Sequence, residues 1–194
     1  RHGESPLPVI AAQSPADCFH ATLEAARLAI KYMTPVILLT DGYLANGAEP
    51  WKVPAVGDMP DISVANHTDL ATFHPYARDP HTLARPWAVP GTPGLEHRIG
   101  GLEKADISGN VSYDPDNHHR MSLLRAAKVA RIAGDIAPLE VLGPPTGDLL
   151  ILGWGSTYGP IRSAVERLQA RGKAVAHAHL RHLNPFPSNT GDVL

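Results

Sequence analysis

Several clusters of polar residues in this sequence have types and spacings that could support chemistry. Arg1, His2 and Glu4 place a guanidinium, an imidazole and a carboxylate within four residues, directly before a predicted strand. Loops beside strands often present such groups to a substrate. A charged turn without a chemical role explains the same residues equally well. Arg1, His2 and Glu4 are therefore candidate catalytic residues, and both interpretations stay open.

Three histidines near the end of the chain raise the possibility of a metal site. His177 and His179 alternate on a predicted strand and so share one face, and His182 follows closely. Imidazoles at this spacing can bind zinc, but a tetrahedral site needs further ligands, and no Cys or carboxylate lies close in sequence. Histidines on a polar sheet face or at a subunit contact are the favoured interpretation. We predict no metal site, and a zinc protein remains an alternative.

A glycine-rich turn, Gly153–Gly159, lies between a predicted strand and a predicted helix. Backbone amides at the start of a helix can bind a phosphate. However, the following strand lacks the acidic residue that holds the ribose in dinucleotide sites, although Arg181 could meet a phosphate instead. The favoured interpretation is a turn that packs the helix on the sheet. The alternative is a free-standing nucleotide-binding α/β regulatory module.

Two weaker patterns lie earlier in the chain. Asp41-Gly42, with Asn66 downstream, weakly resembles the motif that holds magnesium diphosphate in thiamine enzymes. Thr40 stands where that motif has a glycine, and His67 where it has a second asparagine. We therefore interpret Asp41-Gly42 as a turn after a buried strand. Glu96, His97 and Arg98 lie between glycines at 94 and 101, and this segment could cover a site or contact a partner.

The first elements predicted to position these groups form a βαβ unit. An apolar run at 8–12 precedes a helix over 15–32, for which Ser14 is a suitable N-cap. The continuous apolar run at 35–40 is typical of a parallel strand covered on both faces. Residues 50–93 are rich in proline and lack periodicity, but their aromatic side chains favour packing on a neighbouring surface over disorder.

The second half of the sequence predicts another alternating unit. A helix is expected over 115–134, with Asp114 before it and Gly134 closing it. Strands are expected at 139–142, 148–153 and 173–180, with a helix over 160–171 between the last two. The chain is therefore predicted to be an α/β protein.

Composition narrows the class of protein. The chain has 194 residues, 43% hydrophobic and 19% charged, a formal net charge of −2 and one cysteine, Cys18. One cysteine excludes an internal disulfide, and it excludes an iron–sulfur cluster held by this chain alone. The charge offers no general attraction to nucleic acid, and no apolar run approaches the ~20 residues of a membrane span. We expect a cytoplasmic protein and, since the sequence begins with Arg1, a piece of a longer chain.

Longer strings of this sequence resemble the alpha subunits of 2-oxoacid:ferredoxin oxidoreductases, in particular those acting on 2-oxoglutarate. The matching strings are 3–6, 94–101, 110–115, 152–159 and 177–187. Residues 180–185 also resemble the C-terminal domain of transketolase-like thiamine enzymes. The resemblance implies the tail of a thiamine pyrimidine-binding domain (1–48), an irregular Pro-rich connection (49–113), and a helix with a truncated transketolase C-terminal-like parallel α/β domain (114–194).

The resemblance also implies a reaction, in which 2-oxoglutarate, coenzyme A (CoA) and oxidised ferredoxin give succinyl-CoA, CO2 and reduced ferredoxin. Thiamine diphosphate, Mg²⁺ and a [4Fe–4S] cluster would be held mainly by the beta subunit. Beta subunit, ferredoxin, CoA and 2-oxoacid would be the partners, with no role for nucleic acid or membrane. The family's activating glutamate, its Tyr-Pro-Ile-Thr-Pro stretch and its carboxylate-gripping basic residue are not found here and are expected upstream. The piece alone is thus expected to be inactive. For the whole enzyme, pyruvate or a branched 2-oxoacid is the alternative substrate.

Overall fold

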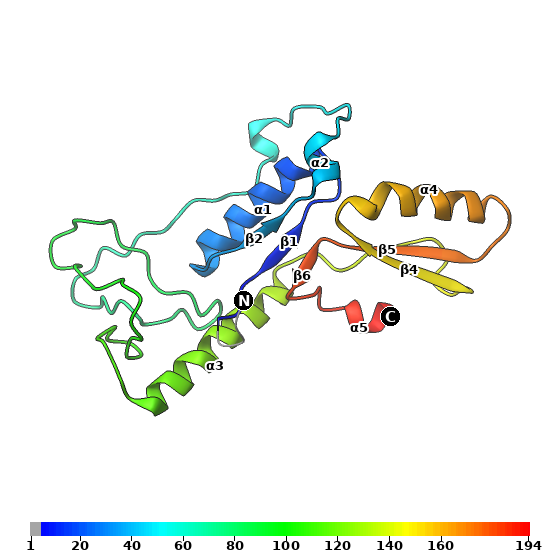
Figure 1. Ribbon diagram of the computed structural model, residues 1–194. Helices are drawn as coiled ribbons and strands as arrows, with labels where there is room; N and C mark the ends of the chain where they lie inside the picture. Colours follow the sequence, from blue (N-terminus) through cyan, green and yellow to red (C-terminus); the bar gives the residue numbers. More distant parts are fainter. Residues whose placement is uncertain (1–4) are drawn as a thin grey trace.

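The protein was analysed as a computed structural model that describes residues 5–194 (Figure 1). Its first unit is a βαβ arrangement of β1 (Val9–Ala11), α1 (Asp17–Tyr32) and β2 (Ile37–Leu39). β1 and β2 are parallel, with Val9 opposite Ile37. The Ser14 hydroxyl accepts a hydrogen bond from the backbone N–H of Asp17 at 3.2 Å, so it caps α1 as predicted. The first predicted βαβ unit is confirmed.

The strand β2 differs from the sequence-based expectation. Its side chains are not covered on both faces: Ile37 is 38% exposed, and Leu38 and Leu39 are half-buried. The reason is position, because β2 is an edge strand among the described residues and pairs with β1 alone. A short helix, α2 (Gly42–Asn46), follows where a turn was expected, since Asp41 caps it by accepting from Leu44 N–H at 3.0 Å.

Residues 47–114 form long irregular loops, with one short 3₁₀ turn, η1 (Val56–Asp58). In Figure 1 these loops extend along α1 and α3, away from the second sheet. They are attached by specific contacts: the Trp87 indole N–H donates to the carbonyl of Ile30 at 3.0 Å, and Arg131 donates to the carbonyl of His81 at 3.1 Å. The expectation of an irregular but packed segment is confirmed.

The long helix α3 (Pro115–Arg131) continues into a 3₁₀ turn, η2 (Ile132–Gly134), close to the predicted range. Asp114 accepts a hydrogen bond from the backbone N–H of Asp116 at 3.0 Å, and Pro115 occupies the first turn, where proline is tolerated. One charged residue of this helix, Lys128, is buried. Its ammonium donates to the carbonyl of Met33 at 3.1 Å.

The second sheet has the strand order β3-β5-β4. It contains β3 (Val141–Leu142), β4 (Leu149–Trp154) and β5 (Val175–Leu180), and the connection from β4 to β5 passes through η3 (Gly155–Thr157) and α4 (Tyr158–Gln169). β4 and β5 are parallel, which confirms the second βαβ unit, whereas β3 is antiparallel to β5. The α/β fold class is confirmed, with mixed rather than purely parallel sheets.

The end of the chain links the two sheets. After β5, the strand β6 (His182–Asn184) pairs antiparallel with β1, so the first sheet has the order β2-β1-β6. This strand was not predicted. A last short helix, α5 (Thr190–Val193), follows it. Because β5 and β6 are consecutive and belong to different sheets, the residue between them, Arg181, lies at the boundary of the two units.

Each unit has its own apolar core. The first packs α1 and β1 against the end of α3, with Ile10, Leu28 and Ile132 fully buried, and the second packs Leu139 against β5. None of the helices described over residues 5–194 is long and apolar enough to cross a bilayer.

Candidate functional site

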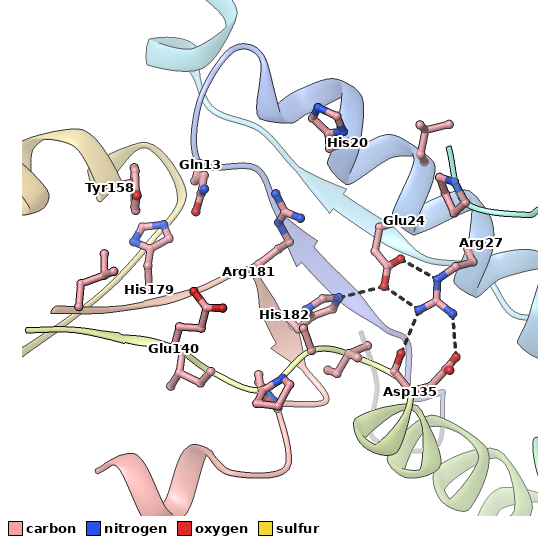
Figure 2. A pocket seen from close by; sticks show the side chains of 18 of the residues that line it. Gln13, His20, Glu24, Arg27, Asp135, Glu140, Tyr158, His179, Arg181 and His182 are labelled. Atoms are coloured by element: carbon pink, nitrogen blue, oxygen red, sulfur yellow. Dashed lines mark hydrogen bonds and ion pairs between the residues drawn. The ribbon is translucent and has the colours of Figure 1, made fainter. Parts of the chain in front are cut away.

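A cavity of about 590 Å³ lies between the two units, and Figure 2 shows its lining. Gln13 follows β1, Tyr158 follows β4 and Arg181 follows β5, so the cavity collects residues that come after the carboxyl ends of three strands. In open α/β sheets this is where ligands bind, because loops and helix N-termini converge there. The volume is in the range of small-molecule sites.

Arg181 is anchored at the centre of this boundary. Its guanidinium pairs with the carboxylate of Asp17, a buried residue in the first turn of α1, and its carbonyl accepts from Ala11 N–H at 2.8 Å. The other oxygen of Asp17 accepts from Gln13 N–H at 3.0 Å. The Arg181 side chain is still 34% exposed, so part of the guanidinium faces the cavity. Burial lowers the pKa of Arg181 from its ordinary value.

A second cluster of charges joins α1 to the turn after α3. Arg27 donates to both oxygens of Glu24, at 2.7 and 2.8 Å, and to Asp135 at 2.8 Å (Figure 2). Lys31 also pairs with Asp135 at 2.8 Å. Burial alone would raise the pKa of Glu24, but the hydrogen bonds and charge of Arg27, together with the nearby His182 imidazole, hold it at about 2. We call Glu24, Arg27, Lys31 and Asp135 the seam network.

A cluster of three rings lies on the other side of the site, and two of them, Tyr158 and His179, line the cavity. His177 and His179 lie 5.4 Å apart between ring centroids, and the Tyr158 ring lies 5.0 Å from His179. The ring nitrogens of both histidines are buried and have no hydrogen-bond partner. Burial, with a smaller effect of His177, lowers the pKa of His179 to about 4, so this imidazole is neutral at physiological pH. The pair behaves as part of an aromatic wall.

The three histidines do not form one site. His177 and His179 share a face of β5 as predicted, but His182 lies on β6 and points toward Glu24, with its Nε2 3.4 Å from that carboxylate (Figure 2). Over the described range 5–194, no group of three or more His, Cys, Asp or Glu side chains is arranged to hold a metal. The favoured interpretation, histidines on a sheet face, fits this geometry.

The glycine-rich turn after β4 is not arranged to receive an anion. Gly155 adopts a positive φ of 64°, which glycine allows without strain. The next amide, Ser156 N–H, already faces a carboxylate oxygen of Asp41 at 3.4 Å. A phosphate placed at this amide would meet that negative charge. The contact therefore favours the packing role of the turn over a nucleotide site.

Asp41 and Asn66 do not show a metal–diphosphate arrangement either. Both oxygens of Asp41 already accept hydrogen bonds, from Leu44 N–H and Ser156 N–H. Its interaction with the Ser156 side chain, followed by the hydrogen bond from the Leu44 backbone, holds the pKa of Asp41 below its ordinary value. Asn66 instead forms a backbone bridge with Trp87 in the irregular segment. The described residues thus do not fit the magnesium end of thiamine diphosphate.

Two candidate clusters from the sequence remain, one at the start of the chain and one in the irregular segment. Arg1, His2 and Glu4 lie outside the described residues, so they stay predictions. Glu96 accepts a hydrogen bond from Gly94 N–H at 2.8 Å, and His97 contacts the carbonyl of Leu95 at 2.8 Å, so these polar groups stabilise their own loop.

Of the residues that line the main cavity, sequence patterns indicated His179, Arg181 and His182 but missed the charged residues of α1 and Asp135. The seam network joins Arg27 to Asp135, which are 108 positions apart, and Asp17 pairs with Arg181 across 164 positions. No local motif marks such pairs. The described lining of the cavity includes charged side chains such as Arg181, Glu24 and Asp135, which can bind and orient a polar group.

Comparison with known proteins identifies the family to which the chain belongs. The family model described as pyruvate flavodoxin/ferredoxin oxidoreductase, thiamine-diphosphate-binding, matches residues 1–113, which is more than half of the chain. The chain belongs to this family. The resemblance stated from the sequence strings is confirmed.

Members of this family match the chain over nearly its whole length. The 2-oxoglutarate oxidoreductase subunit KorA of Mycobacterium tuberculosis is 58% identical over 100% of this chain and 30% of its own length. The alpha subunit of 2-oxoacid:ferredoxin oxidoreductase 1 of Aeropyrum pernix is 29% identical over 96% of this chain and 29% of its own length. The chain therefore spans about a third of the length of these relatives.

A solved structure agrees in fold. The 2-oxoglutarate:ferredoxin oxidoreductase of Magnetococcus marinus, with 2-oxoglutarate, coenzyme A and succinyl-CoA bound, superposes with a TM-score of 0.89 and 33% identity. The superposition covers 98% of this chain and 33% of the solved chain. Both sheets and the irregular segment thus belong to the architecture of this family of oxidoreductases.

Proposed function

We propose that this chain is part of the alpha subunit of a thiamine-diphosphate-dependent 2-oxoacid:ferredoxin oxidoreductase. The enzyme would convert 2-oxoglutarate and CoA to succinyl-CoA and CO2 and pass the electrons to ferredoxin. The observation that carries the proposal is the 58% identity, over the whole chain, to a relative named as a 2-oxoglutarate oxidoreductase subunit. Of the relatives that share less identity with this chain, one is named for 2-oxoacids in general and one for ketoisovalerate, so the substrate needs a test of its own.

In this proposal the cofactors are held mainly by another chain, the beta subunit. Bound thiamine diphosphate supplies the electron sink for decarboxylation. The described residues do not fit its magnesium site, and the sole cysteine, Cys18, cannot hold a [4Fe–4S] cluster. A reducing, cytoplasmic location agrees with the single cysteine.

The residues of this chain would then serve as a scaffold. We divide it into the end of the pyrimidine-binding domain (1–48), the connecting segment (49–113) and the transketolase-like part (114–194). The pairing of Arg181 with Asp17 and the seam network hold the third part against the first. Arg1, His2 and Glu4, which precede β1, remain our proposed residues near the cofactor or substrate.

The proposal is tested with the purified enzyme that contains this chain. We expect CoA-dependent reduction of ferredoxin with 2-oxoglutarate, at a higher kcat/KM than with pyruvate or 2-oxoisovalerate. A preference for pyruvate would overturn the substrate assignment. If none of the three acids reduced ferredoxin, the reaction class itself would be wrong.

A further inference from the structure

A second cavity, separate from the one between the sheets, is surrounded by positive charge. It has a volume of about 510 Å³ and lies between the irregular segment and helix α3. We call its cationic lining residues the basic cluster; they are Arg78, Arg85, Lys104, Arg125 and Lys128. Among the described lining residues, Glu103 is the one carboxylate.

That carboxylate is already engaged. Glu103 accepts from Arg125 through both oxygens, each at 3.2 Å, and from His118 at 2.7 Å. Asp106, which also acts on Arg78, does not line the cavity and pairs with Arg120 at 2.8 Å. No ion pair within residues 5–194 neutralises Arg78, Arg85 or Lys128, so the cluster carries a surplus of positive charge.

The guanidiniums of the cluster are held in place before any ligand binds. Arg85 lies 4.5 Å and Arg78 6.0 Å from the centre of the Tyr76 ring, a distance typical of cation–π contacts. Arg78 also donates to the carbonyl of Leu83 at 3.1 Å, while its Nε is buried without a partner. An unpartnered buried donor is costly unless another group accepts from it.

Two lysines are buried in the same region. Lys104 is 1% exposed and its ammonium donates to the carbonyl of Gly100 at 2.7 Å. Lys128 is 7% exposed and donates to Met33, which uses one of its three donors. Burial first, and then the charges of Arg78, Arg85 and Arg125, lower the pKa of Lys128 to about 8. Lys128 and the three arginines are therefore close enough to destabilise one another.

We propose that this cavity binds a small organic anion carrying two or more negative charges on phosphate or carboxylate oxygens. A multiply charged oxyanion would offset the repulsion within the basic cluster and accept hydrogen bonds from the guanidinium and ammonium groups that line the cavity. Guanidiniums recognise phosphate and carboxylate through paired hydrogen bonds, and lysines add point charges. The volume suits a small molecule rather than a protein segment. The proposal does not rest on the reaction assigned to the enzyme.

Calorimetric titration of the purified enzyme complex containing this chain tests the site. The probes are inorganic pyrophosphate, tricarballylate and, as a singly charged control, acetate. We expect one pyrophosphate or tricarballylate per chain, bound more tightly than acetate, and the tighter of the two identifies the phosphate or the carboxylate as the preferred group. If neither bound more tightly than acetate, the proposal would be wrong.

Substitutions locate the binding to the cavity. Arg85→Gln should weaken binding by about tenfold or more, because each charge-assisted contact contributes over 1 kcal/mol, which is about tenfold in affinity. Arg78→Gln is an independent second variant if the first fails to fold, as judged by circular dichroism. Arg167→Gln, on the exposed face of α4, is the matched control and should bind like the unaltered protein. Equal weakening by the cluster variants and the control would show general surface attraction and overturn the proposal.

Discussion

Replacing Arg27 with methionine tests whether the seam network holds helix α1 against the turn that follows α3. Arg27 connects Glu24 with Asp135, and the side chains of all three are only 20–25% exposed. Methionine keeps much of the buried stem while removing the charge and the hydrogen bonds. The variant leaves Glu24 facing His182, and Asp135 facing Lys31.

The expected magnitude follows from the pKa of Glu24. Its fall from 4.5 to about 2 corresponds to about 3 kcal/mol of stabilisation of the folded state. Residual exposure and the remaining partners reduce the share lost in Arg27→Met to about 2 kcal/mol. Because the folded pKa is the lower one, this stability is fully present above about pH 4.5 and disappears as the pH falls toward 2.

The assay is urea unfolding of the unaltered protein and of Arg27→Met, followed by circular dichroism at pH 7 and at several values down to pH 3. We expect a loss of about 2 kcal/mol at pH 7 and a smaller loss at pH 3. The matched control is Glu166→Gln, which breaks an exposed pair with Arg162 on α4 and should cost less than about 0.5 kcal/mol. If Arg27→Met cost no more than this control, the seam network would not stabilise the packing of α1 against the turn after α3.

Three further outcomes are expected. The imidazole of His179 should stay neutral in an NMR titration until the pH approaches 4, and a titration midpoint near 6.5 would contradict this. Because protonation of a group with a lowered pKa opposes folding, the free energy of unfolding should fall less between pH 6.5 and pH 4 in His179→Gln than in the unaltered protein. Gly147→Ala should lower the free energy of unfolding by about 2 kcal/mol or more, because the added Cβ would overlap a backbone carbonyl oxygen. Gly57→Ala is the control and should be nearly neutral, since the space around Gly57 is open; equal shifts in the melting temperatures of the two variants would contradict the packing argument. Asn189→Ala should lower the free energy of unfolding in urea by about 1–3 kcal/mol, because the side-chain amide of Asn189 accepts a hydrogen bond from Leu139 N–H and donates one to the Leu139 carbonyl. An unchanged unfolding midpoint would refute this.

Local sequence signals predicted the long helices α1, α3 and α4 and the βαβ connections. Helix α1 carries apolar residues every three or four positions behind a Ser14 cap, and α3 begins after Asp114 and Pro115. These signals depend on neighbours within one or two turns, so no distant contact is needed to interpret them. The strand β6 was missed because three residues, His182 to Asn184, carry too little pattern.

The candidate site was predicted much less well than the fold. Alternation on β5 placed His177 and His179 on one face, but whether His182 joined them depended on a change of sheet at Arg181. The same change of sheet creates the cavity at the boundary. A switch of this kind is set by how two units pack, and a short string of residues does not encode it.

By itself, the sequence determined the α/β class, the order of the main elements, the single cysteine and, through long matching strings, the family. These properties are local or compositional, so they survive without knowledge of distances. Only the tertiary structure decided which charges meet: Arg27 with Asp135, Asp17 with Arg181, and the basic cluster around its cavity. Such contacts join residues far apart in the chain, and they exist only because the burial of two apolar cores brings their elements together.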